Sequence, residues 1–184
     1  ADDRNKSFYI FKLRFRFCIM TNFVPIFPLS IVVYPGETLN LHIFEPRYKE
    51  LVKECVAGKK TFGIPTIING KLSEMGTLVT IAEVAKEYEN GEMDIVTIGT
   101  MVFRILEIIK SVPDKLYSGA IVNYPHNSNA YHKQELMQLV LKAVRELHRL
   151  LNISKDFKKP DEELTAYDIA HHAGLSLEEE YELL

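Results

Sequence analysis

The sequence predicts an α+β chain: an antiparallel β pseudo-barrel with one inserted helix, followed by a C-terminal helical bundle. Two changes of pattern predict this fold class. From Asn22 to Tyr124, short β-rich runs alternate with turn-forming residues, which is typical of strands. After residues 125–128, apolar residues recur every three or four positions, which is the spacing of a helix buried along one side. Because no long helices alternate with the strands, we expect the strands to pair antiparallel.

A turn followed by a strand is predicted over residues 34–43. Pro35 fixes φ at the second position of the turn, and Gly36 permits a positive φ at the third. In the strand, alternate side chains are apolar, so one face is expected to be buried. These side chains are Leu39, Leu41 and Ile43.

Two longer β-rich runs, residues 77–88 and 93–109, are joined through Asn90-Gly91. An Asn-Gly pair is the strongest short signal for a hairpin, because a type I′ turn needs positive φ at both central residues. Residues 117–124 are predicted to form a further strand. We therefore expect five or six strands in this part of the chain.

One helix is predicted between the strands, beginning at Pro46 and closed by Gly58. Glu45 is expected to cap its first backbone amides and to pair with Arg47, which would fix the corner between strand and helix. The apolar residues of this segment follow helical spacing: Tyr48, Leu51, Val52 and either Cys55 or Val56.

The C-terminal third is predicted to be helical. Apolar residues from Leu136 to Leu151 step by three and four, which predicts a helix of about five turns with one apolar stripe. Pro160 and its charged neighbours end this helix, and Gly174 marks a later helix C-terminus. Two capping boxes predict further helix starts: Thr165 with Asp168, and Ser176 with Glu179.

The composition is that of an ordinary globular chain. Its 184 residues carry a net charge of −3, which argues against wholesale coating of nucleic acid or of an anionic membrane. We expect residues 1–20 to be a non-native or disordered N-terminal extension, of which residues 1–19 lie upstream of a natural start at Met20. We expect residues 21–126 to form the pseudo-barrel, and residues 127–184 to form a helical subdomain that is truncated at its C-terminus.

The two cysteines, Cys18 and Cys55, cannot build a disulfide framework or a four-thiolate zinc site. We interpret both as reduced thiols, which favours a cytoplasmic location. No apolar run approaches the ~20 residues that span a bilayer, so no membrane partner is expected.

Several segments between residues 24 and 184 together form a pattern specific enough to indicate a family. They are Ile26-Phe27-Pro28-Leu29, Val33-Tyr34-Pro35-Gly36-Glu37, Leu41-His42-Ile43-Phe44-Glu45-Pro46-Arg47-Tyr48, Gly76-Thr77-Leu78-Val79-Thr80-Ile81, Asp94-Ile95-Val96-Thr97-Ile98-Gly99 with Phe103-Arg104-Ile105, and Ala166-Tyr167-Asp168-Ile169-Ala170 with Gly174-Leu175-Ser176. In this order they closely resemble the N-terminal domain of Lon proteases.

The resemblance implies a PUA-like pseudo-barrel followed by helices, which acts as a non-catalytic module that gathers unfolded or tagged proteins. In full Lon proteases this domain serves an ATP-driven unfoldase and a Ser-Lys peptidase. A related domain in the cereblon ubiquitin-ligase receptor is also a protein-interaction module. Two departures are visible. Val102 stands where the family often has Arg, and the chain stops at Leu184, before the long helix that would lead to an ATPase.

The catalytic parts of a Lon protease are not expected in this chain. Gly58-Lys59-Lys60-Thr61 fails the phosphate-loop pattern GxxxxGK[ST], and no SxxK sequence is present. The six histidines lack metal-ligand spacing, so we expect no metal, no cofactor and no catalytic residue. Residues 170–176 resemble the turn of a helix-turn-helix. However, the segment that follows carries four carboxylates and no base, which argues against nucleic acid.

The predicted function is a protein-binding module that engages exposed apolar segments of unfolded or tagged proteins, in a groove between barrel and helices or by strand addition. An ATPase or protease partner and a weak homo-oligomer are left open. So are two alternatives: the excised N-terminal part of an ATP-dependent Lon protease, and a small-ligand-binding or enzymatic barrel. The candidate peptide-binding residues are Tyr34, Phe44, Arg47, Tyr48 and Phe103.

Overall fold

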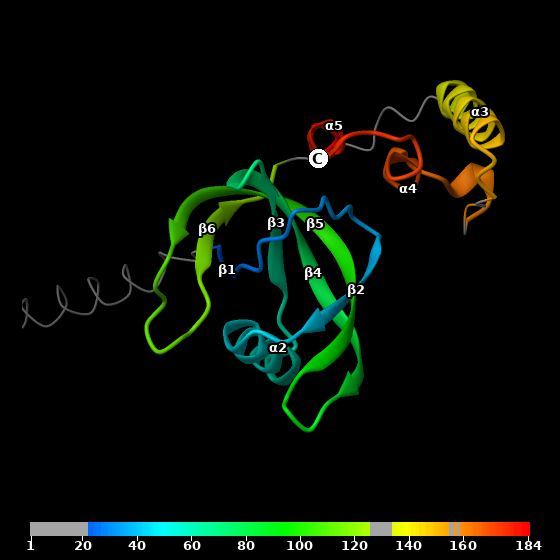
Figure 1. Ribbon diagram of the computed structural model, residues 1–184. Coiled ribbons are helices and arrows are strands. Elements are labelled where there is room, and N and C mark those ends of the chain that lie inside the picture. The colour runs from blue at the N-terminus through cyan, green and yellow to red at the C-terminus, as the bar shows by residue number, and fades with distance from the viewer. Residues whose placement is uncertain (1–21, 126–133, 155–156, 158) are drawn as a thin grey trace, which may run out of the picture.

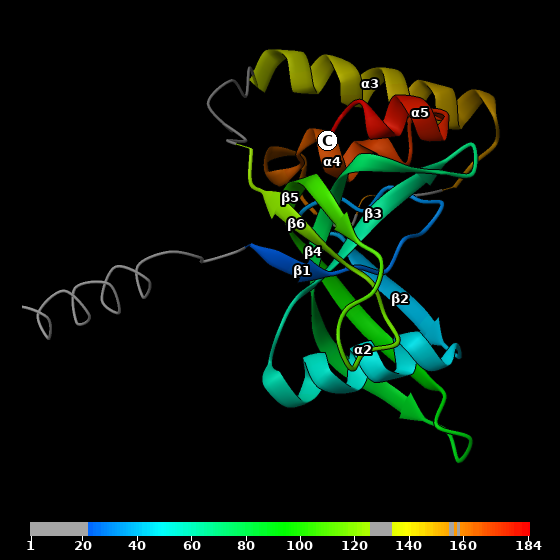
Figure 2. The same ribbon diagram turned by 90° about the vertical axis from the view of Figure 1, so that its left-hand side faces the viewer.

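The computed structural model describes residues 22–125, 134–154, 157 and 159–184. The predicted extension at residues 1–20, which includes Cys18, lies outside the described residues. Figures 1 and 2 show a strongly curved sheet between two sets of helices. At one end lies α2 (Pro46–Gly58), and at the other lie α3 (Gln134–Leu150), α4 (Ala166–Ala170) and α5 (Leu177–Tyr181).

The sheet has six strands, and every pairing between its named strands is antiparallel. Two parallel bridges, between Ile26 and Gly63 and between Leu29 and Thr66, join the segment that follows β1 to β3, at the other edge of the sheet. The predicted antiparallel sheet with an inserted helix is therefore confirmed. In sheet order the strands are β1 (Phe23–Pro25), β6 (Gly119–Asn123), β5 (Met93–Ile109), β4 (Lys71–Glu87) and β3 (Phe62–Ile68), with β2 (Thr38–Ile43) also paired to β5.

The core of the sheet is divided between two clusters. One lies against α2 and contains the buried Leu51, Val52 and Phe62. The other surrounds Phe103, whose side chain is 0% exposed. A Cβ built on Gly63 or on Gly76 would come within 2.8 Å of the Phe103 ring, so this ring occupies the space that two glycines leave open. Glycine is required there by close packing rather than by backbone conformation.

The C-terminal helices make two different sets of contacts. Leu141 and Val144 of α3 pack against Ile169 of α4, whereas α5 lies against the sheet. Both predicted capping boxes are present, at Thr165 and at Ser176. The predicted α3 is confirmed as a helix of 17 residues, but a bundle of all three helices stays a prediction.

Two hairpin turns differ from the prediction. At residues 90–91 only Gly91 has positive φ, and Tyr88 N donates to the Glu92 carbonyl at 2.9 Å, so the predicted type I′ turn is wrong and a three-residue loop replaces it. Asn90 Oδ1 accepts from Glu92 N at 3.0 Å, which stabilises the longer loop. The two-residue turn with positive φ at both positions is instead Asn69-Gly70, between β3 and β4, which the sequence analysis missed.

The helix α2 begins at Pro46 as predicted, but its caps differ. Glu45 makes no side-chain bond to the backbone amides; instead it accepts from Arg47 Nε at 2.8 Å. The predicted cap is therefore wrong and the predicted ion pair is confirmed, because the guanidinium competes for the same carboxylate. At the other end, the left-handed residue is Lys59 rather than Gly58.

The turn before β2 is confirmed. Gly36 has φ of +84°, and Glu37 N donates to the Tyr34 carbonyl at 3.1 Å. This turn presents both Tyr34 and Glu37 to the C-terminal helices, which is where the description of the site begins.

Candidate functional site

The five predicted contact residues divide between surface and core. Phe44 is 57% exposed and Arg47 is also exposed, and both lie where β2 passes into α2. Tyr48 is buried beside them, with the Arg47 guanidinium 4.5 Å from the centroid of its ring. Tyr34 and Phe103 are 1% and 0% exposed. The structure thus groups three of the five at one corner and places the other two in separate clusters of the core.

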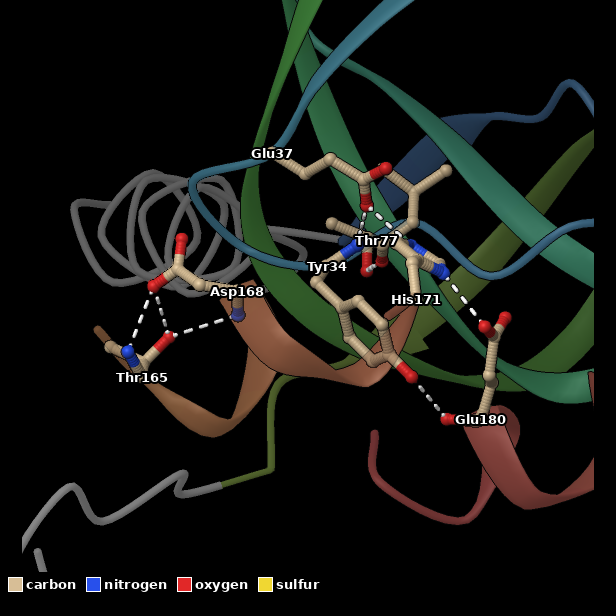
Figure 3. A network of polar contacts seen from close by, with 8 residues as sticks. Tyr34, Glu37, Thr77, Thr165, Asp168, His171 and Glu180 are labelled. Carbon is tan, nitrogen blue, oxygen red and sulfur yellow. Dashed lines mark hydrogen bonds and ion pairs between the residues drawn. The ribbon is translucent and has the colours of Figure 1, made fainter. Parts of the chain in front are cut away.

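Tyr34 packs against the helices α4 and α5 (Figure 3). Its hydroxyl donates to the Glu180 carbonyl at 2.7 Å, and its ring stacks on Tyr167 with a centroid separation of 4.9 Å. Thr77 of β4 donates to the Val33 carbonyl just before Tyr34 in the chain. Through these hydrogen bonds and this ring stacking, Tyr34 links the sheet to both helices.

His171, at the end of α4, lies between two carboxylates (Figure 3). Its Nδ1 is 2.8 Å from Glu180 Oε1 on α5, and its Nε2 is 3.2 Å from Glu37 Oε2 beside the sheet. A neutral imidazole carries one N–H, so both bonds form only with the protonated ring. Hydrogen bonding to Glu37 and Glu180 raises the pKa of His171 to about 9. The site is an ion-paired clamp, which we call the His171 clamp.

The groove predicted between sheet and helices is filled by the chain's own side chains at α4 and α5, so that expectation is corrected here. Val32, Tyr34 and Ala170 are buried together, and the sheet also bonds directly to α5. Met75 N donates to the Tyr181 hydroxyl at 2.9 Å. The partly buried side chains that complete this contact are Tyr167, Leu177, Tyr181 and Leu184.

An apolar pocket of about 340 Å³ lies beside the β3–β4 hairpin. It opens over the Phe103 cluster, since Ile26 belongs to that cluster and Leu72 packs against it. Among the described residues that line it, Lys110 is the one charged side chain. We call this hollow the hairpin pocket; it is lined by Ile26, Pro28, Ile67, Gly70, Leu72, Ile108, Lys110 and Ser118.

A larger hollow of about 970 Å³ lies between α3 and the 3₁₀ turn η2 (Asp161–Glu163). Charged side chains of both signs line it, and Arg145 makes two bonds of 2.8 and 2.7 Å to Asp161 at its edge. An apolar side chain entering here would have to displace water from these charges. The hairpin pocket is therefore better suited to an apolar ligand group.

Neither the His171 clamp nor the residues of the hairpin pocket stood out in the sequence. The sequence predicts no such role for His171, which is one of the six histidines without metal-ligand spacing and lies in the helix-turn-helix-like segment 170–176. Its actual partners are 134 and 9 residues away, and no local pattern connects them. Among the described residues, no three His, Cys, Asp or Glu side chains are grouped as a metal site. Within the described part of the chain, no helix combines the length and the apolar character needed to cross a membrane.

Comparisons with known proteins place this geometry in context. The model of a family described as the ATP-dependent protease La (LON) substrate-binding domain matches residues 24–184. A solved structure of a Lon N-terminal domain protein from Xanthomonas campestris is 25% identical, with a TM-score of 0.64 and 88% of each chain covered. The N-terminal domain of a Mycobacterium avium complex Lon protease is 14% identical, with a TM-score of 0.53 and 71% of this chain and 72% of that chain covered. At that identity, the second likeness is one of fold alone.

Proposed function

Because the chain belongs to the LON substrate-binding domain family, we propose that it is a non-catalytic module that binds exposed apolar segments of unfolded or tagged proteins. The family description supports substrate binding as its role, and the predicted resemblance is confirmed. What we propose beyond the family description is that the bound segments are apolar. An ATPase or protease that receives the bound protein is part of the same proposal.

The hairpin pocket is the observation that carries the proposal. Most of its lining residues are apolar, and its volume of about 340 Å³ is at the small end of ligand sites, which suits one large side chain. Burying a Leu or Phe side chain contributes roughly 1.5–3 kcal/mol. This is offset in part by the cost of ordering a flexible segment, so a single contact binds weakly. We expect dissociation constants in the micromolar range or above unless several segments are engaged together.

The corner formed by Phe44, Arg47 and Tyr48 is kept in the proposal as a second contact. Phe44 offers an exposed ring, and Arg47, which pairs with Glu45, lies beside it. Tyr34 and Phe103 would act indirectly, by supporting the surfaces above them. We also propose that the chain divides into two subdomains. Residues 21–126 form the sheet subdomain, and residues 127–184 form the helical subdomain.

Replacing Ile108 with glutamate is expected to weaken binding of an unfolded model protein at least tenfold. Ile108 is 42% exposed and lines the pocket, so a carboxylate there would have to be desolvated when an apolar side chain enters. The measurement is a titration of the ¹⁵N-labelled chain with a permanently unfolded protein, followed by amide chemical shifts.

Ile98→Glu is the matched control, because Ile98 lies on the same strand and is 38% exposed but pairs with Thr38 and Thr80 away from the pocket. Equal affinity of the Ile108→Glu and Ile98→Glu variants would reject the hairpin pocket as the site. Absence of any shift at near-millimolar ligand would reject apolar-segment binding altogether.

A further inference from the structure

The hairpin pocket lies where two β-hairpins separate. The ladder between β4 and β5 ends at the pair Met75 and Arg104. Beyond this pair, β4 continues alongside β3, and β5 continues alongside β6. Leu72 on the first hairpin and Ile108 on the second both line the pocket. The pocket therefore receives side chains from two pairs of strands that are no longer paired with each other.

The polar groups of the pocket are concentrated on one of these hairpins. The ladder between β5 and β6 ends one position short of Lys110 and Ser118, so these two residues lie opposite each other. They carry the polar side chains among the described residues that line the pocket. On the other hairpin, the lining pair is Ile67 and Leu72, which is apolar. One wall is therefore apolar, and the other ends in an ammonium group beside a hydroxyl.

No carboxylate neutralises this ammonium group inside the pocket. Within the described part of the chain, Lys110 takes part in no ion pair, and no Asp or Glu lines the pocket. Side chains alternate along a strand, so Glu107 points away from the face that Ile108 and Lys110 share. Glu178 of α5 reaches the β3–β4 turn, but it accepts from Asn69 at 3.2 Å and is not a lining residue. The anion that matches Lys110 is therefore left for a ligand to supply.

The C-terminus of a polypeptide combines the two groups that the pocket would bind. A volume of about 340 Å³ suits one large apolar side chain. In a C-terminal residue, the carboxylate is attached to the same Cα atom as that side chain, so one residue reaches both walls. In an internal extended segment, neighbouring side chains point to opposite sides, so an Asp or Glu next to the apolar residue would point away from Lys110. A terminal residue also leaves no onward chain that would have to pass Lys110 and Ser118.

We propose that the hairpin pocket binds the C-terminal residue of an unfolded or tagged protein, an inference that rests on the function proposed above. The apolar side chain of that residue contacts Ile67, Leu72 and Ile108. Its carboxylate accepts hydrogen bonds from the Lys110 ammonium and the Ser118 hydroxyl. The ligand class is thus a flexible polypeptide end whose last residue is large and apolar, such as Leu or Phe. Because Lys110 is exposed, solvent weakens the ion pair, and the carboxylate raises the affinity about fivefold.

Short peptides that differ only at the last residue test this proposal. The first ends in Leu with a free carboxylate, the second ends in Leu with a C-terminal amide, and the third ends in Ser with a free carboxylate. Each is titrated into the ¹⁵N-labelled full chain and followed by amide chemical shifts. We expect the Leu peptide with the free carboxylate to bind about fivefold more tightly than its amide. The Ser peptide should bind more weakly still, because burial of the apolar side chain contributes more than the exposed ion pair.

Lys110→Gln separates the contribution of the carboxylate from that of the apolar contact. It is expected to lower the affinity for the free-carboxylate Leu peptide to that of the amide, and to leave the affinity for the amide unchanged. Lys71→Gln is the matched control, because Lys71 is an exposed lysine next to the same β3–β4 turn but does not line the pocket. Both lysines are exposed, so both variants should keep the fold, which their amide spectra report.

The possible outcomes distinguish this inference from the proposed function. Equal affinity for the carboxylate and amide peptides, no shift with any peptide, or an equal response to Lys110→Gln and Lys71→Gln would each overturn C-terminal recognition. If the permanently unfolded protein still bound in a way that depended on Ile108, the binding of apolar segments would stand without it. Absence of shifts with the peptides and with the unfolded protein alike would overturn both.

Discussion

Replacement of Phe103 by alanine is expected to lower the free energy of unfolding by about 3–5 kcal/mol. The Phe103 side chain is fully buried, and its ring fills the space above Gly63 and Gly76. Neither glycine has a side chain that could move into the cavity left behind, so the site cannot collapse easily. The measurement is urea-induced unfolding, read as a shift of the midpoint at constant slope.

Phe44→Ala is the matched control for this experiment. Phe44 is 57% exposed, so removing its ring should change the free energy of unfolding by less than about 0.5 kcal/mol. If Phe44 is a ligand contact, its removal weakens binding without loss of stability, whereas Phe103→Leu should leave binding intact. A small loss of stability in Phe103→Ala would contradict the packing described for this cluster.

The second large effect concerns the His171 clamp and depends on pH. The pKa of His171 is raised to about 9 in the folded chain, against an ordinary value near 6.5. Its contribution to stability is therefore fully present below about pH 6.5 and is lost as the pH rises through about 9. The ring is 33% exposed, so solvent screening reduces the contribution, and we expect about 1–2 kcal/mol.

His171→Gln is expected to remove this contribution at pH 6, while variant and wild type converge near pH 10. Glutamine can keep one hydrogen bond but carries no charge between Glu37 and Glu180. The measurement is the difference in unfolding free energy between variant and wild type at a series of pH values. His42→Gln serves as control, because His42, whose side chain is 48% exposed, pairs with Asp94 at 2.6 Å on the surface, where little net stability is expected. A pH-independent difference for His171→Gln would count against the clamp.

The parts of the fold that the sequence predicted correctly depend on residues close together in the chain. The turn at Gly36, the start of α2 at Pro46 and the two capping boxes are each set within four residues. The strand β3 was missed because Gly63 and Pro65 weaken the appearance of a strand. In the structure, the register shifts just after Pro65, and this bulge accommodates the proline.

The candidate site was less predictable, for a physical reason. An aromatic residue is recognisable in a sequence, but whether it is covered depends on partners far along the chain. Tyr34 is buried by a contact with Glu180, which is 146 residues away, and Phe103 is buried by side chains that lie both before and after it in the chain, from Val24 to Val122. Phe44, with the same chemical character, is left exposed because β2 ends there.

The contacts of α5 also have a mechanical consequence. The helix lies within the last eight residues, yet it bonds to the sheet through Tyr181 and to the turn before β2 through Glu180. A pulling force applied at Leu184 would therefore reach the sheet through these few side chains before it stretched any strand. Traction on this end of the polypeptide should detach α5 first and leave the strands paired, so the C-terminus would yield as a separate, early step under load.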